Sequence, residues 1–204
     1  MKMLILAVLG AIVLFGLIIV LTAVGSYNGL VGKSQAADSA WADVQNQYQR
    51  RADLVPNLVQ TVQGAANFEK STLVEVTDAR ASVGKVTINT NGVPADQATL
   101  DQYQAAQGRL GSALSHLLVV SEKYPDLKAN RNFIDLQAQL EGTENRIATS
   151  RGDFNTAVQD YDTSLQKFPT VLIAGMFHFT SKPYFQAAPT AATAPTVNFN
   201  FNNQ

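Results

Sequence analysis

An unbroken run of apolar positions opens the chain. From Met3 to Val24 only Thr22 and two glycines interrupt it, and no charged residue occurs between Met3 and Gly32. A helix of 22 residues is about 33 Å long, enough to cross the roughly 30 Å hydrocarbon core of a bilayer. Residues 1–25 are therefore predicted to form a transmembrane anchor.

A cleaved secretory signal is the alternative interpretation. Lys2 supplies a positive start, and the small residues at 23–26 are compatible with a cleavage site. The apolar run exceeds the roughly 7 to 15 residues of a typical signal, which favours an uncleaved anchor. Lys2 precedes the run, whereas Lys33 beyond it is soon offset by Asp38 and Asp43. This bias weakly favours an N-terminus inside the cell and a domain outside it.

The clearest helical pattern lies near the end of the domain. Large apolar residues recur there at every seventh position: Phe133, Leu140, Ile147, Phe154, Tyr161 and Phe168. A second row runs beside them through Leu136, Thr143, Ser150, Ala157 and Leu165. This heptad register predicts a helix of about 35 residues that packs on its neighbours at coiled-coil-like angles.

Three further helices are predicted upstream. Their apolar rows are Trp41, Val44 and Tyr48; then Val55, Val62, Val76 and Val83; then Tyr103, Leu110, Leu117 and Tyr124. We expect the first to span residues 27–51 and the second to begin at Pro56, with Asp53 as its cap. The third should stop near Pro125, because the residue before a proline resists the α conformation.

The predicted fold is all-α: an N-terminal transmembrane helix followed by an antiparallel up-and-down bundle of long helices over residues 26–168. Its joints fall at 53–56, 84–94 and 125–130. Short joints between long helices favour antiparallel neighbours. Because the fourth helix then runs back towards the anchor, its end is expected near the membrane surface.

Two C-terminal segments follow the bundle. Residues 169–185 are apolar and aromatic, with Lys182 as their only charge. They either form a membrane-interface patch or fold back to cap the open end of the bundle. The candidate interface residues are Leu172, Met176, Phe177, Phe179, Tyr184 and Phe185. Residues 186–204 are uncharged, interrupted by proline and rich in asparagine, so we predict a disordered tail.

A row of small residues follows the anchor, at spacings of three and four: Gly25, Gly29, Gly32, Ala36 and Ala40. Glycine inside a helix costs about 1 kcal/mol relative to alanine, so three of them indicate close approach of another helix. That helix is either the fourth helix of the same subunit or a second copy of the chain. The second possibility predicts a homo-oligomer.

Composition argues against several functions. The net charge is −1, from 15 basic and 16 acidic residues, which does not suit nucleic-acid binding. The chain has no cysteine, and its two histidines, His116 and His178, lie far apart without a Glu-x-x-His pair. No phosphate loop or HExxH motif occurs. We therefore expect neither an enzyme nor a metal or cofactor.

Charged and polar residues gather at two places: Arg50, Arg51, Asp53 and Asn57, with Pro56 among them, at the predicted first joint, and Glu141, Glu144 and Arg146 on the fourth helix. One interpretation is that these residues form exposed ion pairs and helix caps, each of which contributes little to stability. The alternative is a surface that binds an unknown protein partner, which would make the chain a signalling or adaptor module.

Several motifs together resemble the LemA family of bacterial membrane proteins. They are YNGLV at 27–31, Trp41, QYQRRADLVPNLV at 47–59, YPDLKAN at 124–130 and EGTENRI at 141–147. The likeness covers residues 27–185. Asn67, Phe154 and Asp162 depart from the family's His, Tyr and Asn, outside the strongest motifs.

The resemblance implies a single-pass anchor in a bacterial cell membrane, a long-helix domain and no established reaction. Members are linked to envelope and signalling phenotypes, and one relative to the formation of an internal membrane. Some accounts of the family place the domain in the cytoplasm, opposite to the charge bias. The function expected is a non-enzymatic scaffold in contact with the bilayer, self-associating and organising or shaping membrane.

Overall fold

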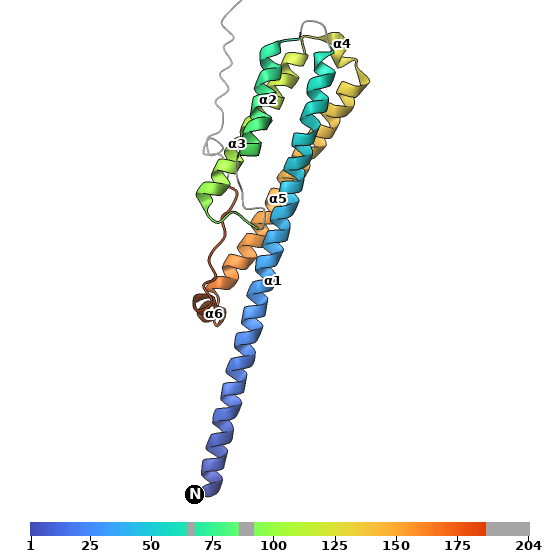
Figure 1. The fold of residues 1–204 in the computed structure, drawn as a ribbon. Helices are drawn as coiled ribbons and strands as arrows, with labels where there is room; N and C mark the ends of the chain where they lie inside the picture. Colours follow the sequence, from blue (N-terminus) through green and yellow to red (C-terminus); the bar gives the residue numbers. More distant parts are fainter. Residues whose placement is uncertain (65–67, 86–91, 187–204) are drawn as a thin grey trace, which may run out of the picture.

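The computed structural model describes residues 1–64, 68–85 and 92–186. Its helices are α1 (Lys2–Gln63), α2 (Lys70–Lys85), α3 (Gln97–Ser121), α4 (Pro125–Lys128), α5 (Arg131–Gln166) and α6 (Thr170–Met176). The described ranges contain no strand. Long helices alternate in direction along the bundle, as Figure 1 shows, so the predicted all-α, up-and-down architecture is confirmed. The predicted tail lies outside the described residues, except for Gln186.

One helix serves as both anchor and bundle element. α1 is 62 residues long, or about 93 Å at the usual helical rise. Residues 1–22 are all exposed, and this part of α1 projects from the bundle in Figure 1. Within the described ranges α1 is the one helix long and apolar enough to cross a membrane. The expected span therefore continues into the domain without a break.

The predicted joint at residues 53–56 is wrong, because α1 continues through Pro56 to Gln63. Proline in a helix interior leaves the carbonyl four residues earlier without its usual donor. Here that carbonyl, on Ala52, accepts a hydrogen bond from Arg80 Nε of α2 at 3.0 Å. Asp53 does not cap a helix; it accepts a hydrogen bond from Gln49 at 2.7 Å. The chain reverses only after Gln63.

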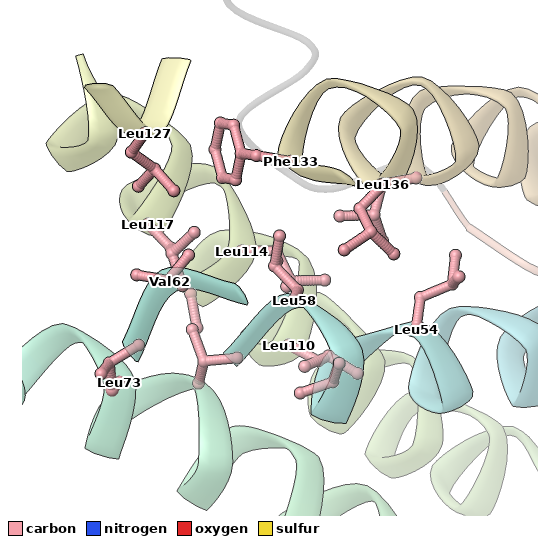
Figure 2. Packing of buried hydrophobic residues seen from close by; sticks show 14 residues of the cluster. Leu54, Leu58, Val62, Leu73, Leu110, Leu114, Leu117, Leu127, Phe133 and Leu136 are labelled. Carbon is pink, nitrogen blue, oxygen red and sulfur yellow. The ribbon is translucent and has the colours of Figure 1, made fainter. Parts of the chain in front are cut away.

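Burial explains why the helix persists across the proline. Four α1 side chains on either side of Pro56 are at most 8% exposed: Leu54, Val55, Leu58 and Val62. A joint at this point would remove some of them from the core, at about 1.5–3 kcal/mol for each large apolar side chain. Figure 2 shows Leu54, Leu58 and Val62 facing side chains of the other helices. Tertiary packing thus overrides the local signal for a helix start.

The long fourth helix is confirmed as α5, which has 36 residues. Asn130 caps it by accepting hydrogen bonds from the backbone of Asn132 and Phe133. The heptad residues from Phe133 to Tyr161 are buried, whereas Phe168 lies beyond the helix and is 80% exposed. α3 begins at the Asp96 cap and ends at Ser121, so the predicted stop before Pro125 is also confirmed.

The core falls into three layers along the bundle. A distal layer contains leucines and valines from α1 to α5, including Leu58, Leu117 and Phe133 (Figure 2). A middle aromatic layer surrounds Trp41. A third layer, closest to the anchor, joins Leu30 of α1 to residues of α5 and α6. This last layer positions α6 where α1 emerges from the predicted membrane span.

Candidate functional site

The short helix α6 packs against α1 just beyond the anchor. The Tyr27 ring of α1 lies 4.9 Å from the Phe177 ring and 5.7 Å from the Phe179 ring, both in edge-to-face geometry. Leu30, one turn further along α1, shares a buried cluster with Ala174 of α6. α6 therefore lies within two helical turns of Val24, the last residue of the apolar run, as the predicted direction of the fourth helix requires.

Large apolar side chains at this end of the bundle face outwards. The exposed residues are Phe168, Val171, Leu172, Met176 and Phe177, with exposed fractions from 42% to 80%. Leu172, Met176 and Phe177 were predicted as interface residues, and they are accessible. Phe179 is half-buried beside Tyr27. Exposed apolar residues in one contiguous segment are typical of a protein or membrane contact.

The segment after α6 behaves differently. Phe185 is 6% exposed and stacks on Trp41, with ring centroids 5.9 Å apart. It also contacts the Phe154 ring at 5.5 Å, and the Arg151 guanidinium lies 4.5 Å from its centroid. Tyr184 is half-buried beside the same cluster. Membrane contact is therefore wrong for Phe185, which returns to the bundle core, and Tyr184 follows the same path.

An ion pair fixes this returning segment to α1. Lys182 Nζ donates to Asp38 Oδ1 at 2.9 Å, with the lysine side chain only 17% exposed. The Lys182 backbone N–H donates to Asp162 of α5 at 3.2 Å. Tyr161 donates its hydroxyl to the Thr180 carbonyl at 3.1 Å. The only charge in residues 169–185 is thus paired within the bundle, which leaves the outward face of α6 uncharged.

The small-residue ridge consists of Gly25, Gly29, Gly32, Ala36 and Ala40. All are exposed except Ala40, which packs partly against the middle layer. A Cβ added at any of the three glycines would meet no described atom within 4 Å. The glycines therefore do not pack on α5, and the explanation by contact within one subunit is wrong for them.

The predicted partner-binding residues lie on two helices, α1 and α5. Arg50, Pro56 and Asn57 are exposed on the continuous helix α1, so these residues do not lie at a joint between two helices. Glu141 and Arg146 are exposed on α5. Asp53 bonds only to its own helix among the described residues.

Arg51 and Glu144 are the pair that the fold brings together. The Arg51 side chain is 4% exposed, and its Nη1 donates to Glu144 Oε1 at 2.8 Å. Its Nη2 donates to the Gln107 carbonyl at 2.9 Å and to Gln107 Oε1 at 2.6 Å. The guanidinium therefore ties α1, α3 and α5 together at one level. Gln107 lies 56 residues away in sequence, and no motif marked it.

Beside this pair, a groove of about 930 Å³ runs between α3 and α5. Its α3 wall includes Gln104, Gly108 and Ser115, and its α5 wall includes Glu141 and Arg151. Tyr48 and Arg51 of α1 complete the lining. Burial raises the pKa of Tyr48, and it raises that of Tyr103, in the adjacent aromatic layer, to about 12. Both phenols stay protonated at neutral pH, which suits structural roles.

The histidines do not meet. His116 Nδ1 lies 2.8 Å from Glu75 on the exposed side of α2 and α3, and His178 is exposed after α6. Across the described ranges no three His, Cys, Asp or Glu side chains form a group able to hold a metal ion.

Comparison with known proteins identifies relatives. The LemA family profile matches residues 40–199. Magnetosome proteins MamQ 1 and MamQ 2 of Paramagnetospirillum magneticum are each 27% identical over 191 residues, covering 82% of this chain and 67% of the relative. Protein LemA of Metamycoplasma hominis is 21% identical over 165 residues, covering 81% of this chain and 71% of the relative.

Proposed function

Because the chain belongs to the LemA family, we propose that it is a non-enzymatic, membrane-anchored scaffold of a bacterial cell membrane. The end of the bundle that carries α6 contacts the bilayer surface. Copies of the chain associate along the small-residue ridge. The observation that carries this proposal is the exposed apolar face of α6 beside Tyr27, where α1 leaves the predicted span. Relatives named as magnetosome proteins support a role in organising or shaping membrane.

Bilayer contact by α6 follows from three properties of that face. Leu172, Met176 and Phe177 are each more than half exposed. The nearest charge in the segment, Lys182, is held by Asp38 on the bundle side. Aromatic contacts with Tyr27 also hold α6 beside α1, close to the end of the predicted span. Insertion of these side chains removes apolar area from water.

Tryptophan quenching tests the bilayer contact in the full chain reconstituted in vesicles. We expect lipids brominated near the headgroup end of the acyl chains to quench the variant Met176→Trp. Val119→Trp, at a 67% exposed position near the distal end of α3, is the matched control and should not be quenched. Native Trp41 is 1% exposed and supplies the constant background. Equal quenching of both variants would contradict the proposal.

Self-association rests on the exposed glycines. Three glycines on one helix face have no neighbour that a Cβ would touch, although glycine lowers helix stability by about 1 kcal/mol per residue. Close packing of a second copy along this ridge would explain why glycine occupies these positions. Since the chain has no cysteine, single replacements give an unambiguous crosslink. Ala36→Cys on the ridge should form a disulfide dimer in vesicles, whereas Gln35→Cys, exposed on another face, should not.

A blocking variant separates association from folding. Gly29→Leu adds bulk to the ridge but meets no described atom of its own subunit at the Cβ position. We expect the crosslink at Ala36→Cys to fall at least fivefold in this background, while the domain stays folded. An undiminished crosslink would mean that the copies meet elsewhere.

The charge bias beside the anchor leads us to propose an extracytoplasmic domain. Protease digestion of intact cells that carry a C-terminal tag tests this orientation. Loss of the tag without lysis supports it, and protection of the tag until lysis contradicts it.

A further inference from the structure

Residues 182–186 run along the bundle in extended form, held by side-chain amides from two helices. Gln97 of α3 binds the backbone of Tyr184 through both polar atoms: its Oε1 accepts the N–H at 3.1 Å and its Nε2 donates to the carbonyl at 2.9 Å. Asn155 of α5 does the same to Phe185, with both distances 2.9 Å. Such paired contacts recognise main chain and leave side-chain identity open.

The next residue of the segment, Gln186, takes part in only one of the two hydrogen bonds of this pattern in the described part of the chain. Gln104 lies two turns beyond Gln97 on α3, and its Nε2 donates to the Gln186 carbonyl at 3.1 Å. Its Oε1 is buried and accepts no hydrogen bond from any described residue. Nε of Arg51, deeper between the helices, likewise has no acceptor within the described ranges. Buried polar atoms of this kind are costly unless a partner reaches them.

These two unpaired atoms belong to residues of the groove between α3 and α5. Gln104 stands at the end where the described chain stops, and the groove continues along α3 through Gly108 and Gly111 to Leu118. A Cβ at Gly111 would approach Arg51 Nη1 to 3.4 Å, whereas one at Gly108 would meet nothing within 4 Å. Because glycine has no side chain, another backbone can approach α3 closely at these two positions.

The continuation of the chain has the length and chemistry for this groove. Residues 187–196 read AAPTAATAPT, which contains only alanine, proline and threonine. From Gln104 to Leu118, α3 rises about 21 Å, a distance that six or seven extended residues cover. The ionic side chains of the groove, Arg51 and Arg151 with Glu141 and Glu144, balance to zero. An uncharged segment therefore enters without leaving a buried charge unpaired.

We propose that the groove between α3 and α5 binds residues 187–196 of the same chain as an extended strap. The path set by Gln97 and Asn155 directs the main chain past Gln104. Its Oε1 accepts the next backbone N–H, and main-chain carbonyls provide acceptors for Arg51 Nε. Small side chains fit between the walls. Binding in this groove would couple the C-terminal segment to the Arg51–Glu144 pair, because both residues line it.

Spin labelling of the full chain in vesicles tests the strap. A single label at Ser115→Cys reports on the groove, because Ser115 is an exposed lining residue. We expect a strongly immobilised spectrum, and at least a threefold larger mobile component when the chain is ended after Gln186. A label at Thr149→Cys, exposed on α5 outside the groove lining, is the control and should not respond to the truncation. An identical Ser115→Cys spectrum with and without residues 187–204 would overturn the proposal.

Two further experiments test whether the effect depends on the groove and on residues of the same chain. Gly108→Leu fills the groove without a clash at its Cβ, and it should mobilise the Ser115→Cys label as truncation does. Labelled truncated chain reconstituted with unlabelled full-length chain should stay mobile. If it becomes immobilised, the segment comes from a second copy, and the proposal of a strap within one chain is wrong.

Discussion

Arg80 of α2 donates a hydrogen bond from its Nε to the Ala52 carbonyl of α1 at 3.0 Å, which is the acceptor that Pro56 leaves unused. The bond joins the two helices at the point where the sequence favours a break. The carbonyl that Pro56 leaves without its helical donor is therefore bonded to a second helix. The length of α1 beyond the proline therefore depends on a side chain 28 residues away.

Arg80→Ala should destabilise the domain by about 1 kcal/mol, the usual net value of one hydrogen bond. Pro56→Ala should stabilise it by about 1 to 3 kcal/mol, because an N–H becomes available at position 56. In that background the effect of Arg80→Ala should shrink by more than half. Urea unfolding followed by Trp41 fluorescence provides all three values, since Trp41 is the only tryptophan. Strictly additive effects would show that the two features are unrelated.

Alkaline pH should weaken the middle layer through Tyr103. Burial raises its pKa to about 12, from 10.0 for a free phenol, so the folded state holds the proton more tightly than the unfolded state does. The stabilisation is complete below pH 10 and is lost as the pH rises through about 12. Tyr103→Phe cannot ionise, and it should retain more of its pH 8 stability at pH 11 than the parent does.

Urea midpoints measured at pH 8 and pH 11 check this expectation. Tyr27→Phe, which alters an exposed ring beside α6, is the control. The same loss of stability in all three proteins would assign the alkaline effect to other groups.

The two halves of residues 169–185 should respond differently to mutation. Phe185→Ala empties a site between Trp41 and Phe154 and should cost about 3–5 kcal/mol, as is usual for buried phenylalanines. Met176→Ser, at a 71% exposed position, should change the free energy of unfolding by less than about 0.5 kcal/mol. Thermal melts in detergent, recorded by near-ultraviolet circular dichroism, compare them. A large cost for Met176→Ser would place α6 inside the core.

Glu144 and Glu141 form a matched pair one helical turn apart on α5. Only Glu144 contacts Arg51, whose side chain is 4% exposed. Glu144→Ala should therefore cost about 1–3 kcal/mol, since it leaves a buried guanidinium with fewer partners. Glu141→Ala should stay within about 0.5 kcal/mol, although both replacements have the same helix propensity. Equal costs would indicate that the Arg51 contact contributes nothing.

Periodicity predicted the elements because it reports directly on burial. The heptad row from Phe133 to Tyr161 depends on many positions, and its residues are buried as predicted. The apolar run from Met3 to Val24 forms a helix that is long and apolar enough to cross a membrane. The first joint was misplaced because a single proline with an acidic residue before it is typical of a helix start, whereas four buried neighbours decided the outcome. A prediction from neighbouring residues cannot include the hydrogen bond that Arg80 donates from α2.

The candidate site was only partly accessible from sequence. The direction of the fourth helix predicted an apolar segment beside the anchor, and α6 lies there. The division of that segment at Lys182 was not predicted, because it depends on Asp38, 144 residues away. Gln97 and Asn155 carried no motif either: a side-chain amide that binds main chain has no characteristic spacing. Of the eight partner-binding candidates, Arg51 and Glu144 are the two that form an ion pair with each other.

The uninterrupted course of α1 makes it a lever. From Gly25 to Gln63 the helix rises about 57 Å, so a tilt change of about 10° in the bilayer would sweep its far end through about 10 Å. A flexible joint after the span would absorb that motion, but none separates anchor from domain. Long spans tilt further in thinner bilayers. In a bilayer, a change in lipid thickness would therefore move the distal end of the bundle.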